Sequence, residues 1–424
     1  MCGFFGLQSF ELDTNKKLFL ANESILNLKL RGPDSYGVKL IDDNNILFSH
    51  NRLSIIDLSV NGNQPMVSKS GNFTIIYNGE IYNHLKIRAK LKNENNFLLW
   101  KGTSDTETLL QAIEIWGIDR TLSEIKGMFS FVLWNKNSKK MYLSRDRFGE
   151  KPLYYSWIPE IQSFVFSSDL IFDKLFKDIK FEINPYAIND LFHINYIDNE
   201  YTIFKNIKKI EPGSYIEASF KKNHKPNLIT KKYWDSNQIP SKYKTYSDYN
   251  KAKNDLDIIL TEVIKDQILA DVEVGTFLSG GTDSSLITAK AQENSTKKIK
   301  TFCIGNEDQS YDESNYAKKV SEHLGTDHEE IILNDKIMIE SIPDIINKLN
   351  EPIGDSSFIP SYYVSKLAKT KVKVVLTGDA GDEVFGGYNR YTQIRNLKRI
   401  HSIPKFLKKF IKSNFRYISE KNLN

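Results

Sequence analysis

Residues 274–285 read VGTFLSGGTDSS, in which an apolar stretch typical of a buried strand runs into a turn of glycines and serines and then into a helical pattern. Consecutive backbone N–H groups in such a turn, together with the positive end of the helix dipole, favour a bound phosphate. A Walker loop is excluded, because no Gly-Lys-Ser/Thr follows at the required spacing. We therefore predict a phosphate loop of another type. A serine-rich turn that only caps the helix is the alternative for this motif alone.

Strands and helices alternate from this loop onward. After the strand at 274–278 we expect a helix from Ser284, a strand at 301–304, a helix at 316–324 and a strand at 372–376. This alternation predicts an α/β domain with a parallel, doubly wound sheet.

The first part of the chain has a different pattern. Short β-runs separated by turns continue to about residue 220, and the runs 131–134 and 141–144 flank a polar stretch as in a β-hairpin. A helical pattern covers 105–116. Polar residues with Pro226 and Pro240 then predict a linker. We expect a mixed sheet-and-helix (α+β) domain at 1–220, a linker at 221–245 and a second domain at 246–424.

Composition is that of a folded chain. Hydrophobic residues make up 40% and charged residues 26% of 424 residues, a length that favours two or three domains. Neither a membrane-spanning run nor a signal peptide is recognisable, which predicts a cytoplasmic protein with no membrane partner. The net charge of +5 is small and mostly interleaved, so we expect no nucleic-acid partner. Two distant cysteines, Cys2 and Cys303, argue against disulfides and a cysteine-based zinc site.

A cysteine stands directly after the initiator methionine. Met1 is usually removed before a small residue, which would leave Cys2 with both a thiol and a free α-amine. The reference pKa of an α-amine is about 7.7 to 8.0 and that of a thiol about 8.5, so near neutrality the amine can accept the thiol proton. Cys2 is therefore a candidate nucleophile that carries its own base.

Five motifs follow Cys2 in order. They are RGPD at 31–34, NRLSI at 51–55, NGEIYN at 78–83, SDTE at 104–107, and RDRFG at 145–149 followed by KPLYY at 151–155. Together they resemble class II glutamine amidotransferases, the glutaminase half of the asparagine synthetase B family. The resemblance implies an N-terminal-nucleophile (Ntn) hydrolase fold, a four-layer αββα sandwich.

The resemblance also implies roles that suit the chemistry of glutamine. The Asn78 side-chain amide and the Gly79 N–H would bind the oxyanion of the tetrahedral intermediate. Arg52 would hold the α-carboxylate by a two-pronged, charge-assisted contact, and Glu80 and Asp105 would hold the α-ammonium. The predicted catalytic residues of this half are Cys2, Asn78 and Gly79, and the predicted glutamine-binding residues are Arg52, Leu53, Ser54, Ile55, Ile56, Asn78, Gly79, Glu80 and Asp105.

A second motif follows the strand expected at 372–376. Residues 376–388 read LTGDAGDEVFGGY and, with the loop at 279–285, resemble the synthetase half of the same family, which splits ATP into AMP and pyrophosphate. Both loops should lie at the carboxyl ends of strands, where open α/β sheets bind ligands. The ATP-binding residues implied are Leu278, Ser279, Gly280, Gly281, Asp283, Ser284, Ser285, Ile304, Thr377 and Gly378.

Carboxylates in these loops imply a metal and an acid–base group. By the same resemblance Asp283 and Asp382 would hold Mg²⁺ on the phosphates, since this hard cation prefers oxygen ligands. Asp379 would lie beside the acyl-adenylate, where a carboxylate can assist adenylate formation or accept a proton from attacking ammonia. Ala380 stands where glycine is common in the family, which matters only if this position has a positive φ.

The acceptor is less well defined. Residues 351–352 and 355–360 resemble a family stretch near the acceptor, but 351–366 lacks the arginine that some aspartate-using relatives have there. We expect ATP-dependent synthesis of asparagine from aspartate and glutamine. The alternatives are amidation of another carboxylate, such as a sugar acid in surface-polysaccharide synthesis, or a partner or regulator with a glutaminase fold but no synthesis. The oligomeric state stays open, and a homodimer is compatible with the sequence.

The family pattern is shortened at its end. Relatives continue beyond 386–388 into helices that carry a lysine and an arginine-rich acidic motif, neither of which is identifiable after Tyr391. We therefore expect an incomplete second domain in which glutamine hydrolysis is uncoupled from synthesis. The basic, apolar stretch 396–424 is expected to be an amphipathic family helix rather than a membrane-surface helix.

Overall fold

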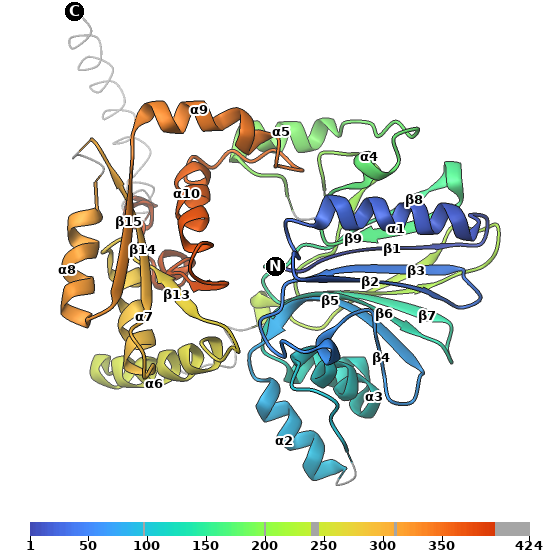
Figure 1. Cartoon of the computed structure of the whole chain (residues 1–424), viewed down its shortest axis with the longest axis horizontal. Coiled ribbons are helices and arrows are strands. Elements are labelled where there is room, and N and C mark those ends of the chain that lie inside the picture. The colour runs from blue at the N-terminus through green and yellow to red at the C-terminus, as the bar shows by residue number, and fades with distance from the viewer. Residues whose placement is uncertain (96–97, 199–200, 239–245, 309–311, 395–424) are drawn as a thin grey trace, which may run out of the picture.

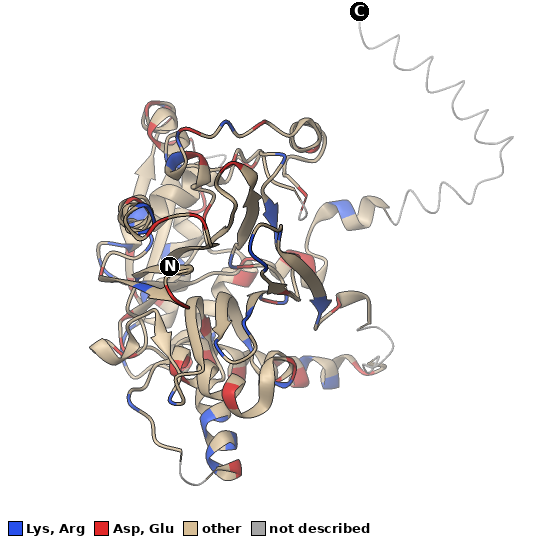
Figure 2. Ribbon diagram, turned by 90° about the vertical axis from the view of Figure 1, so that its right-hand side faces the viewer, with Lys and Arg blue, Asp and Glu red and all other residues tan. Residues whose placement is uncertain are grey.

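The computed structural model describes the chain except residues 96–97, 199–200, 239–245, 309–311 and 395–424. It consists of an N-terminal half with two packed sheets and a C-terminal half with one sheet (Figure 1). Lys and Arg residues alternate with Asp and Glu residues along the ribbon of both halves (Figure 2). In the described part of the chain, no helix has the length and apolar character needed to cross a bilayer.

Two antiparallel six-stranded sheets form the N-terminal half. The first has the strand order β10 (Lys208–Lys209), β8 (Tyr154–Ile158), β9 (Ser163–Ser167), β1 (Gly3–Ser9), β3 (Ile46–Arg52) and β2 (Ser35–Ile41). The second has the order β12 (Asn227–Lys232), β11 (Ser214–Ser219), β7 (Lys140–Arg145), β6 (Gly127–Asn135), β5 (Phe73–Ile81) and β4 (Met66–Val67).

Helices cover the outer face of each sheet. One set consists of α1 (Thr14–Leu28), α4 (Phe172–Leu175) and α5 (Pro185–Ile194), and the other of α2 (His84–Glu94) and α3 (Asp105–Glu124). Strands β1 and β3 are buried along their whole length, because their sheet is covered on both faces. A sheet covered in this way needs side chains that are apolar or hydrogen-bonded on both faces. A central core between the sheets, with Phe4, Phe48, Ile76 and Val132, and one core under each helical layer complete the αββα sandwich. The predicted fold class of this half is confirmed.

The local predictions for this half differ from the structure mainly at its end. The hairpin is β6–β7, with Asn135 opposite Lys140, and the predicted helix is α3, which has a non-helical Gly117 inside it. Strand β12, however, lies inside the predicted linker 221–245 and pairs with β11 from Ser219 to Ser214. Its side chains are mostly exposed at a sheet edge, so its sequence lacks the apolar alternation that marks a strand. Residues 227–232 of the predicted linker therefore belong to the second sheet of the N-terminal half.

The C-terminal half is an α/β layer around a parallel sheet, as predicted, but one of its four strands, Asp327–Leu333, was not among the expected strands. The strand order is β15 (Asp327–Leu333), β14 (Lys300–Asn306), β13 (Val274–Phe277) and β16 (Val374–Leu376). The helices of this half are α6 (Tyr249–Gln267), α7 (Thr282–Glu293), α8 (Ser314–Leu324), α9 (Asp335–Ile346), α10 (Phe358–Ala368) and α11 (Gly381–Phe385). Helices α7 and α8 lie on one face and α10 on the other (Figure 1).

The order of these strands reverses next to β13. The chain moves from β13 to β14 and β15 and then returns to β16 on the other side of β13. In open α/β sheets the crevice at such a switch point is where ligands bind. The two glycine-rich loops follow β13 and β16 directly, so both lie at this point. The predicted helix within 396–424 falls outside the described residues.

Candidate active site

A cavity of about 280 Å³ lies at the N-terminal end of β1, with its walls formed by both halves of the chain. It is lined by Met1, Cys2, Arg52, Leu53, Ile55, Ile56, Gly62, Gln64, Tyr77, Asn78, Gly79, Glu80, Ser104, Asp105, Thr106, Met128, Lys151, Lys373, Val374 and Val375. Of the residues predicted for the glutaminase site, only Ser54 is not among them. The Ser54 N–H instead donates to Asp34 Oδ2 at 2.8 Å.

Regular elements bring the predicted residues together from distant parts of the sequence. Cys2 directly precedes β1, and Arg52 ends the neighbouring strand β3. Asn78 to Glu80 lie on β5 of the other sheet, and Asp105 is the first residue of α3, whose N-cap is Ser104. Four of the residues that line the cavity were not predicted from the sequence, namely Gln64, Tyr77, Met128 and Lys151. Of these only Lys151 lies in a motif quoted from the sequence.

The Cys2 thiol lies beside the loop that follows β3. The Leu53 N–H donates to Cys2 Sγ at 3.4 Å, and the thiol lies 3.7 Å from the Leu53 carbonyl. Burial raises the pKa of the Cys2 thiol above its ordinary value, so the thiol needs a nearby base to become a nucleophile. Burial also lowers the pKa of the Met1 α-amine to about 6, so an α-amine in this place is largely unprotonated at neutral pH. Removal of Met1 would instead free the backbone nitrogen of Cys2 as an α-amine next to the thiol of the same residue.

The side chain of Asn78 has no partner. It is 1% exposed, and neither its Nδ2 nor its Oδ1 makes a hydrogen bond within the described chain. An unsatisfied buried polar group costs about 1–3 kcal/mol, so the folded chain retains a cost here that a ligand could relieve. The adjacent Gly79 packs against the backbone of β6, where a β-carbon would collide with the Met128 carbonyl. Only glycine fits at position 79, next to the unpaired amide of Asn78.

Arg52 is held by backbone carbonyls. Its guanidinium donates to the carbonyl of Ser59 at 2.8 Å and to the carbonyl of Asp57, and to Asn63 Oδ1 at 3.0 Å. The side chain is 6% exposed and lines the cavity. A cation that is oriented in this way without a paired carboxylate among these contacts suits a substrate carboxylate.

Two carboxyl groups face the cavity from β5 and α3. Asp105 accepts hydrogen bonds from the Tyr77 hydroxyl at 2.7 Å and from the Ile81 N–H at 2.9 Å, whereas Glu80 Oε1 has no partner in the described chain. Burial, and then the neighbouring Asp105, hold the pKa of Glu80 well above its usual range, and burial raises the pKa of Asp105. A bound ammonium would reverse both shifts, which is what the predicted role requires.

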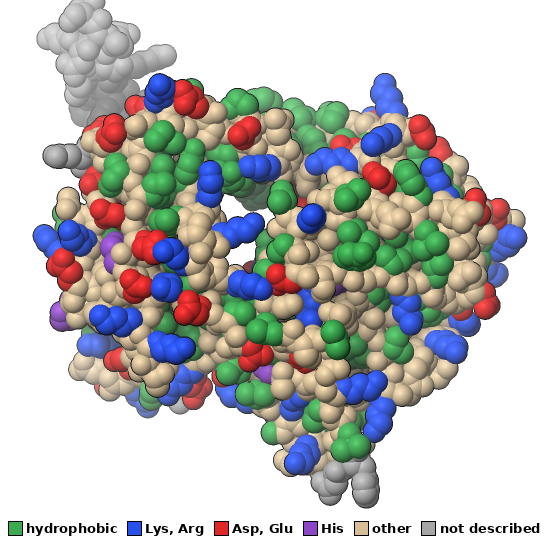
Figure 3. Space-filling model, viewed as in Figure 1, with side chains coloured by type: hydrophobic (Ala, Val, Ile, Leu, Met, Phe, Trp, Pro, Cys, Tyr) green, Lys and Arg blue, Asp and Glu red, His purple; other side chains and the backbone are tan. Residues whose placement is uncertain are grey.

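The second half closes the cavity on one side through the start of β16. Lys373, Val374 and Val375 line this cavity and also a neighbouring cavity of about 340 Å³, which shares Met1 and Leu53 with the first. Apolar side chains of Phe277 and Val372 lie further along the second cavity. Figure 3 shows the surface hollowed between the two halves, with Lys and Arg side chains at the rim. The two cavities are therefore neighbours that lie between Cys2 and the parallel sheet.

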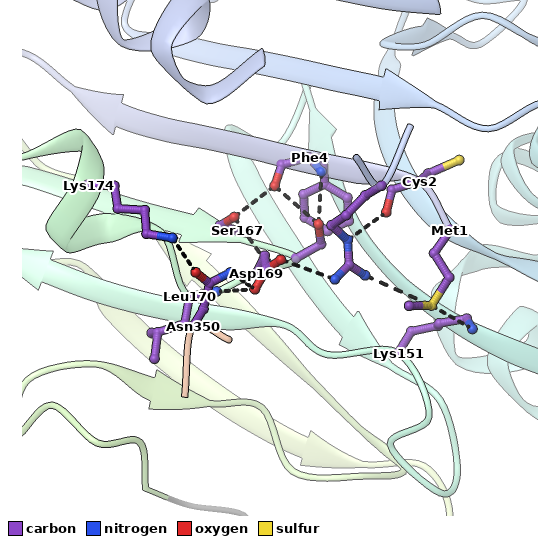
Figure 4. A network of polar contacts seen from close by, with 11 residues as sticks. Met1, Cys2, Phe4, Lys151, Ser167, Asp169, Leu170, Lys174 and Asn350 are labelled. Atoms are coloured by element: carbon purple, nitrogen blue, oxygen red, sulfur yellow. Dashed lines mark hydrogen bonds and ion pairs between the residues drawn. The ribbon is translucent and has the colours of Figure 1, made fainter. Parts of the chain in front are cut away.

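A polar network also links the nucleophile to the second half (Figure 4). Arg31 Nε donates to the Cys2 carbonyl at 3.2 Å, and the Arg31 guanidinium pairs with Asp169 at 3.2 Å. Asp169 in turn accepts from the Asn350 side-chain amide at 2.8 Å, and Lys174 donates to Asn350 at 2.6 Å. The backbone of Cys2 is thus fixed by residues that reach from β1 to the segment before the predicted acceptor stretch.

That acceptor stretch begins with contacts to the N-terminal half. Glu351 accepts from the Ile203 N–H at 3.0 Å and pairs with Lys209 at 2.8 Å, and the Gly354 N–H donates to the Asn195 carbonyl at 3.0 Å. The Glu351 carboxylate is therefore occupied in holding the two halves together.

The two predicted nucleotide loops touch one another. In the first, Gly280 has φ +83°, and Ser279 Oγ lies 3.0 Å from Ser284 Oγ at the start of α7. In the second, a β-carbon on Gly378 would lie only 2.9 Å from the Ser284 backbone nitrogen. Leu278 is buried and Ile304 half-buried below the loops. The structure thus brings together the predicted ATP-binding residues 278–281, 283–285, Thr377 and Gly378, with Ile304 on the neighbouring strand β14.

The carboxylates predicted to hold magnesium come from the same two loops. Asp283 lies in the first turn of α7 and its Oδ2 would be 2.5 Å from a β-carbon on Gly381, the residue before Asp382. No three His, Cys, Asp or Glu side chains of the described residues form a metal-binding group. Two carboxylates fit Mg²⁺ that keeps water and phosphate oxygens as its other ligands.

The second loop also contains a strained residue. Ala380 has φ +68° and ψ 0°, so this position does adopt the left-handed conformation that favours glycine. The neighbouring Asp379 is exposed and accepts from the Thr377 hydroxyl at 2.9 Å. Its carboxylate is therefore oriented at the loop surface.

Comparisons with known proteins agree on both halves. The family described as glutamine amidotransferase domain matches residues 1–234, and the family described as asparagine synthase matches residues 255–422. Glutamine-hydrolysing asparagine synthetase 1 of Bacillus subtilis is 33% identical over 97% of this chain, and a Methanocaldococcus jannaschii relative with the same family name is 35% identical over 96%. The chain spans 62% of the length of the first and 79% of the second. A solved B. subtilis glutamine phosphoribosylpyrophosphate amidotransferase gives a TM-score of 0.40 at 15% identity, covering 78% of this chain and 65% of that one.

Proposed function

Because the chain belongs to the glutamine-hydrolysing asparagine synthetase family, we propose that it releases ammonia from glutamine at Cys2 and transfers it to a carboxylate activated by ATP. The observation that carries the first half of this proposal is the pair of unsatisfied groups beside the thiol. Asn78 Nδ2 and Glu80 Oε1 are buried and unpaired in the same cavity as Cys2. An amide substrate with an α-ammonium group would satisfy both.

Glutamine hydrolysis then follows from the geometry. The α-amine takes the thiol proton, and Cys2 Sγ attacks the side-chain carbonyl carbon of glutamine. The oxyanion accepts from Asn78 Nδ2 and the Gly79 N–H, while Arg52 holds the α-carboxylate and Glu80 and Asp105 hold the α-ammonium. Collapse of this intermediate breaks the C–N bond; the leaving nitrogen takes the proton from the α-ammonium group of Cys2 and departs as ammonia, which leaves a thioester on Cys2. Water hydrolyses the thioester to glutamate and restores the thiol.

The cavities between the halves suit transfer of the released ammonia. The cavity at Cys2 shares Leu53, Val374 and Val375 with the second cavity, which is also lined by Phe277. Where the shared lining is apolar, as at Leu53, Val374 and Val375, ammonia would stay unprotonated and remain a nucleophile, because an ammonium ion would have to be desolvated.

The second reaction is the activation of the acceptor. The acceptor carboxylate attacks the α-phosphorus of ATP, pyrophosphate leaves, and ammonia displaces AMP from the acyl-adenylate. The loops after β13 and β16 would bind the phosphates, and Asp283 and Asp382 would hold Mg²⁺, which neutralises phosphate charge. Asp379 would accept a proton from the attacking ammonia. We propose aspartate as the acceptor, with asparagine, glutamate, AMP and pyrophosphate as products.

Mass spectrometry of the products tests each part. The chain is incubated with glutamine, Mg-ATP and either aspartate or other acids, including sugar acids, and the reaction is repeated without ATP. We expect glutamate in both cases; any asparagine and AMP should form only when ATP and aspartate are present. Absence of glutamate would refute the glutaminase assignment. An amide of another acid would replace aspartate as the acceptor.

A further inference from the structure

The loop 53–57, which follows β3, is held from two sides. On the cavity side, the carbonyl of Asp57 accepts from the guanidinium of Arg52. On the other side, Asp271 of the C-terminal half makes two hydrogen bonds to the same loop. Its N–H donates to the Ile55 carbonyl at 3.0 Å, and its Oδ2 accepts from the Asp57 N–H at 2.8 Å. Asp57 therefore connects Asp271 to Arg52 through a single residue.

A second contact from the C-terminal half reaches the same loop. Lys373 Nζ pairs with Asp34 Oδ2 at 2.7 Å, and that carboxylate oxygen also accepts from the Ser54 N–H at 2.8 Å. Asp271 and Lys373 thus hold the loop at Ile55 to Asp57 and at Ser54, respectively.

Both residues stand just before strands that carry the nucleotide loops. Asp271 lies three residues before the start of β13 and Lys373 directly precedes β16, and these strands pair in parallel with Val274 opposite Val374. The carboxyl ends of the same strands lead into the loops at 279–285 and 377–382. The glutamine-binding loop therefore rests on the opposite ends of the two strands that would hold ATP.

We infer that Asp271, assisted by Lys373, is a positioning residue for glutamine that the synthetase half contributes to the glutaminase site. This inference rests on the proposed function, because it assumes that Arg52 binds the α-carboxylate of glutamine. Asp271 fixes the Asp57 peptide, and the Asp57 carbonyl fixes the guanidinium that faces the cavity. The α-carboxylate is remote from the amide that reacts, so its contact is equal in the ground state and the transition state. Loss of Asp271 therefore raises KM for glutamine and leaves kcat nearly unchanged.

Steady-state glutaminase kinetics on the full chain test this role. Asp271→Ala removes the acceptor for the Asp57 N–H, and KM for glutamine should rise about threefold to tenfold with kcat changed less than about twofold. Asp271→Asn should have nearly the wild-type KM, because an amide oxygen can accept the same hydrogen bond. The control is Asp266→Ala, which removes an exposed ion pair with Lys86, 2.7 Å long, between the same two halves but away from the loop. Its kinetic constants should equal those of the wild type.

The outcomes separate the inference from the proposed function. A wild-type chain that releases no glutamate would overturn the proposed function and the inference with it. An active wild type with the same KM in Asp271→Ala and Asp266→Ala would overturn the inference alone, as would Asp271→Asn with a KM as high as that of Asp271→Ala. If circular dichroism shows that Asp271→Ala is unfolded, Lys373→Met takes its place. A higher KM for that variant supports the inference that the second half positions the loop 53–57, and an unchanged KM overturns this inference.

Discussion

Replacing Asn78 by alanine should lower glutaminase activity without lowering stability. The amide is 1% exposed and unpaired at both atoms, so the folded chain carries the cost of an unsatisfied buried group, about 1–3 kcal/mol. Alanine removes this cost and loses the packing of a few atoms, and the two effects oppose each other. We therefore expect the melting temperature of Asn78→Ala to equal or exceed that of the wild type.

The kinetic effect has the opposite sign. Loss of one oxyanion donor costs about 2.7–4 kcal/mol in the transition state, which lowers kcat about 10²–10³-fold. KM for glutamine should change little, because the donor binds charge that develops only during the reaction. Glutamate release measures both constants, and differential scanning fluorimetry measures stability.

Ser130 provides a matched control for this experiment. It lies opposite Asn78 on β6, is fully buried, and its hydroxyl is also unpaired within the described chain. Ser130→Ala removes a buried orphan group without removing the oxyanion donor, so kcat should stay at the wild-type level. A loss of kcat below tenfold in Asn78→Ala, or a melting temperature several degrees lower, would show that Asn78 has a structural role instead.

Other changes give equally definite expectations. Cys2→Ala should abolish glutamate release while any ammonia-dependent synthesis survives, and undiminished release would remove Cys2 as the nucleophile. Burial lowers the pKa of His50 from 6.5 to about 4, so the unfolded chain binds a proton between these values that the folded chain does not. Stability should therefore fall by about 3 kcal/mol as the pH drops from about 6.5 to 4, and urea unfolding of His50→Gln should show a weaker pH dependence. Ala380→Gly should raise the free energy of unfolding by about 1 kcal/mol, because glycine adopts φ +68° without strain. ATP turnover should yield AMP and pyrophosphate rather than ADP, and the double variant Asp283→Asn, Asp382→Asn should lose it while retaining glutaminase activity.

The sequence predicts the parallel sheet well because its strands are short apolar runs that end in glycine-rich loops. Strand β13 ends at Phe277 and β16 at Leu376, each within a residue or two of the prediction. Strand β12 was missed, because an exposed edge strand gains its stability from backbone hydrogen bonds to β11, which leave no apolar pattern. Pattern-based prediction fails where the partner, and not the side chains, determines the element.

For the site too, the sequence predicts which residues take part but not how they contact one another. Motifs identify which residues gather around Cys2, and the cavity contains nearly all of them. They do not show that both amide atoms of Asn78 are unpaired, or that Asp105 is held by the Tyr77 hydroxyl. Those facts depend on the packing of β5 against its neighbours. The contact of Asp271 with Asp57 joins residues more than 200 positions apart, and no local signal in either segment indicates it.

The start of β16 forms one wall of the cavity at Cys2, and this contact limits how the two halves can be exchanged with those of relatives. Lys373 to Val375 border the cavity at Cys2 although they belong to the other half. A chimera that joins this first half to the second half of a distant relative would change the wall, and with it the substrate affinity of a domain whose own sequence had not been altered. A gene cut between the halves would yield a hydrolase with one side open to water. The junction between the halves that is convenient for cloning is therefore not the boundary of the catalytic unit. The cavity wall of the first half and the start of β16 should be exchanged together.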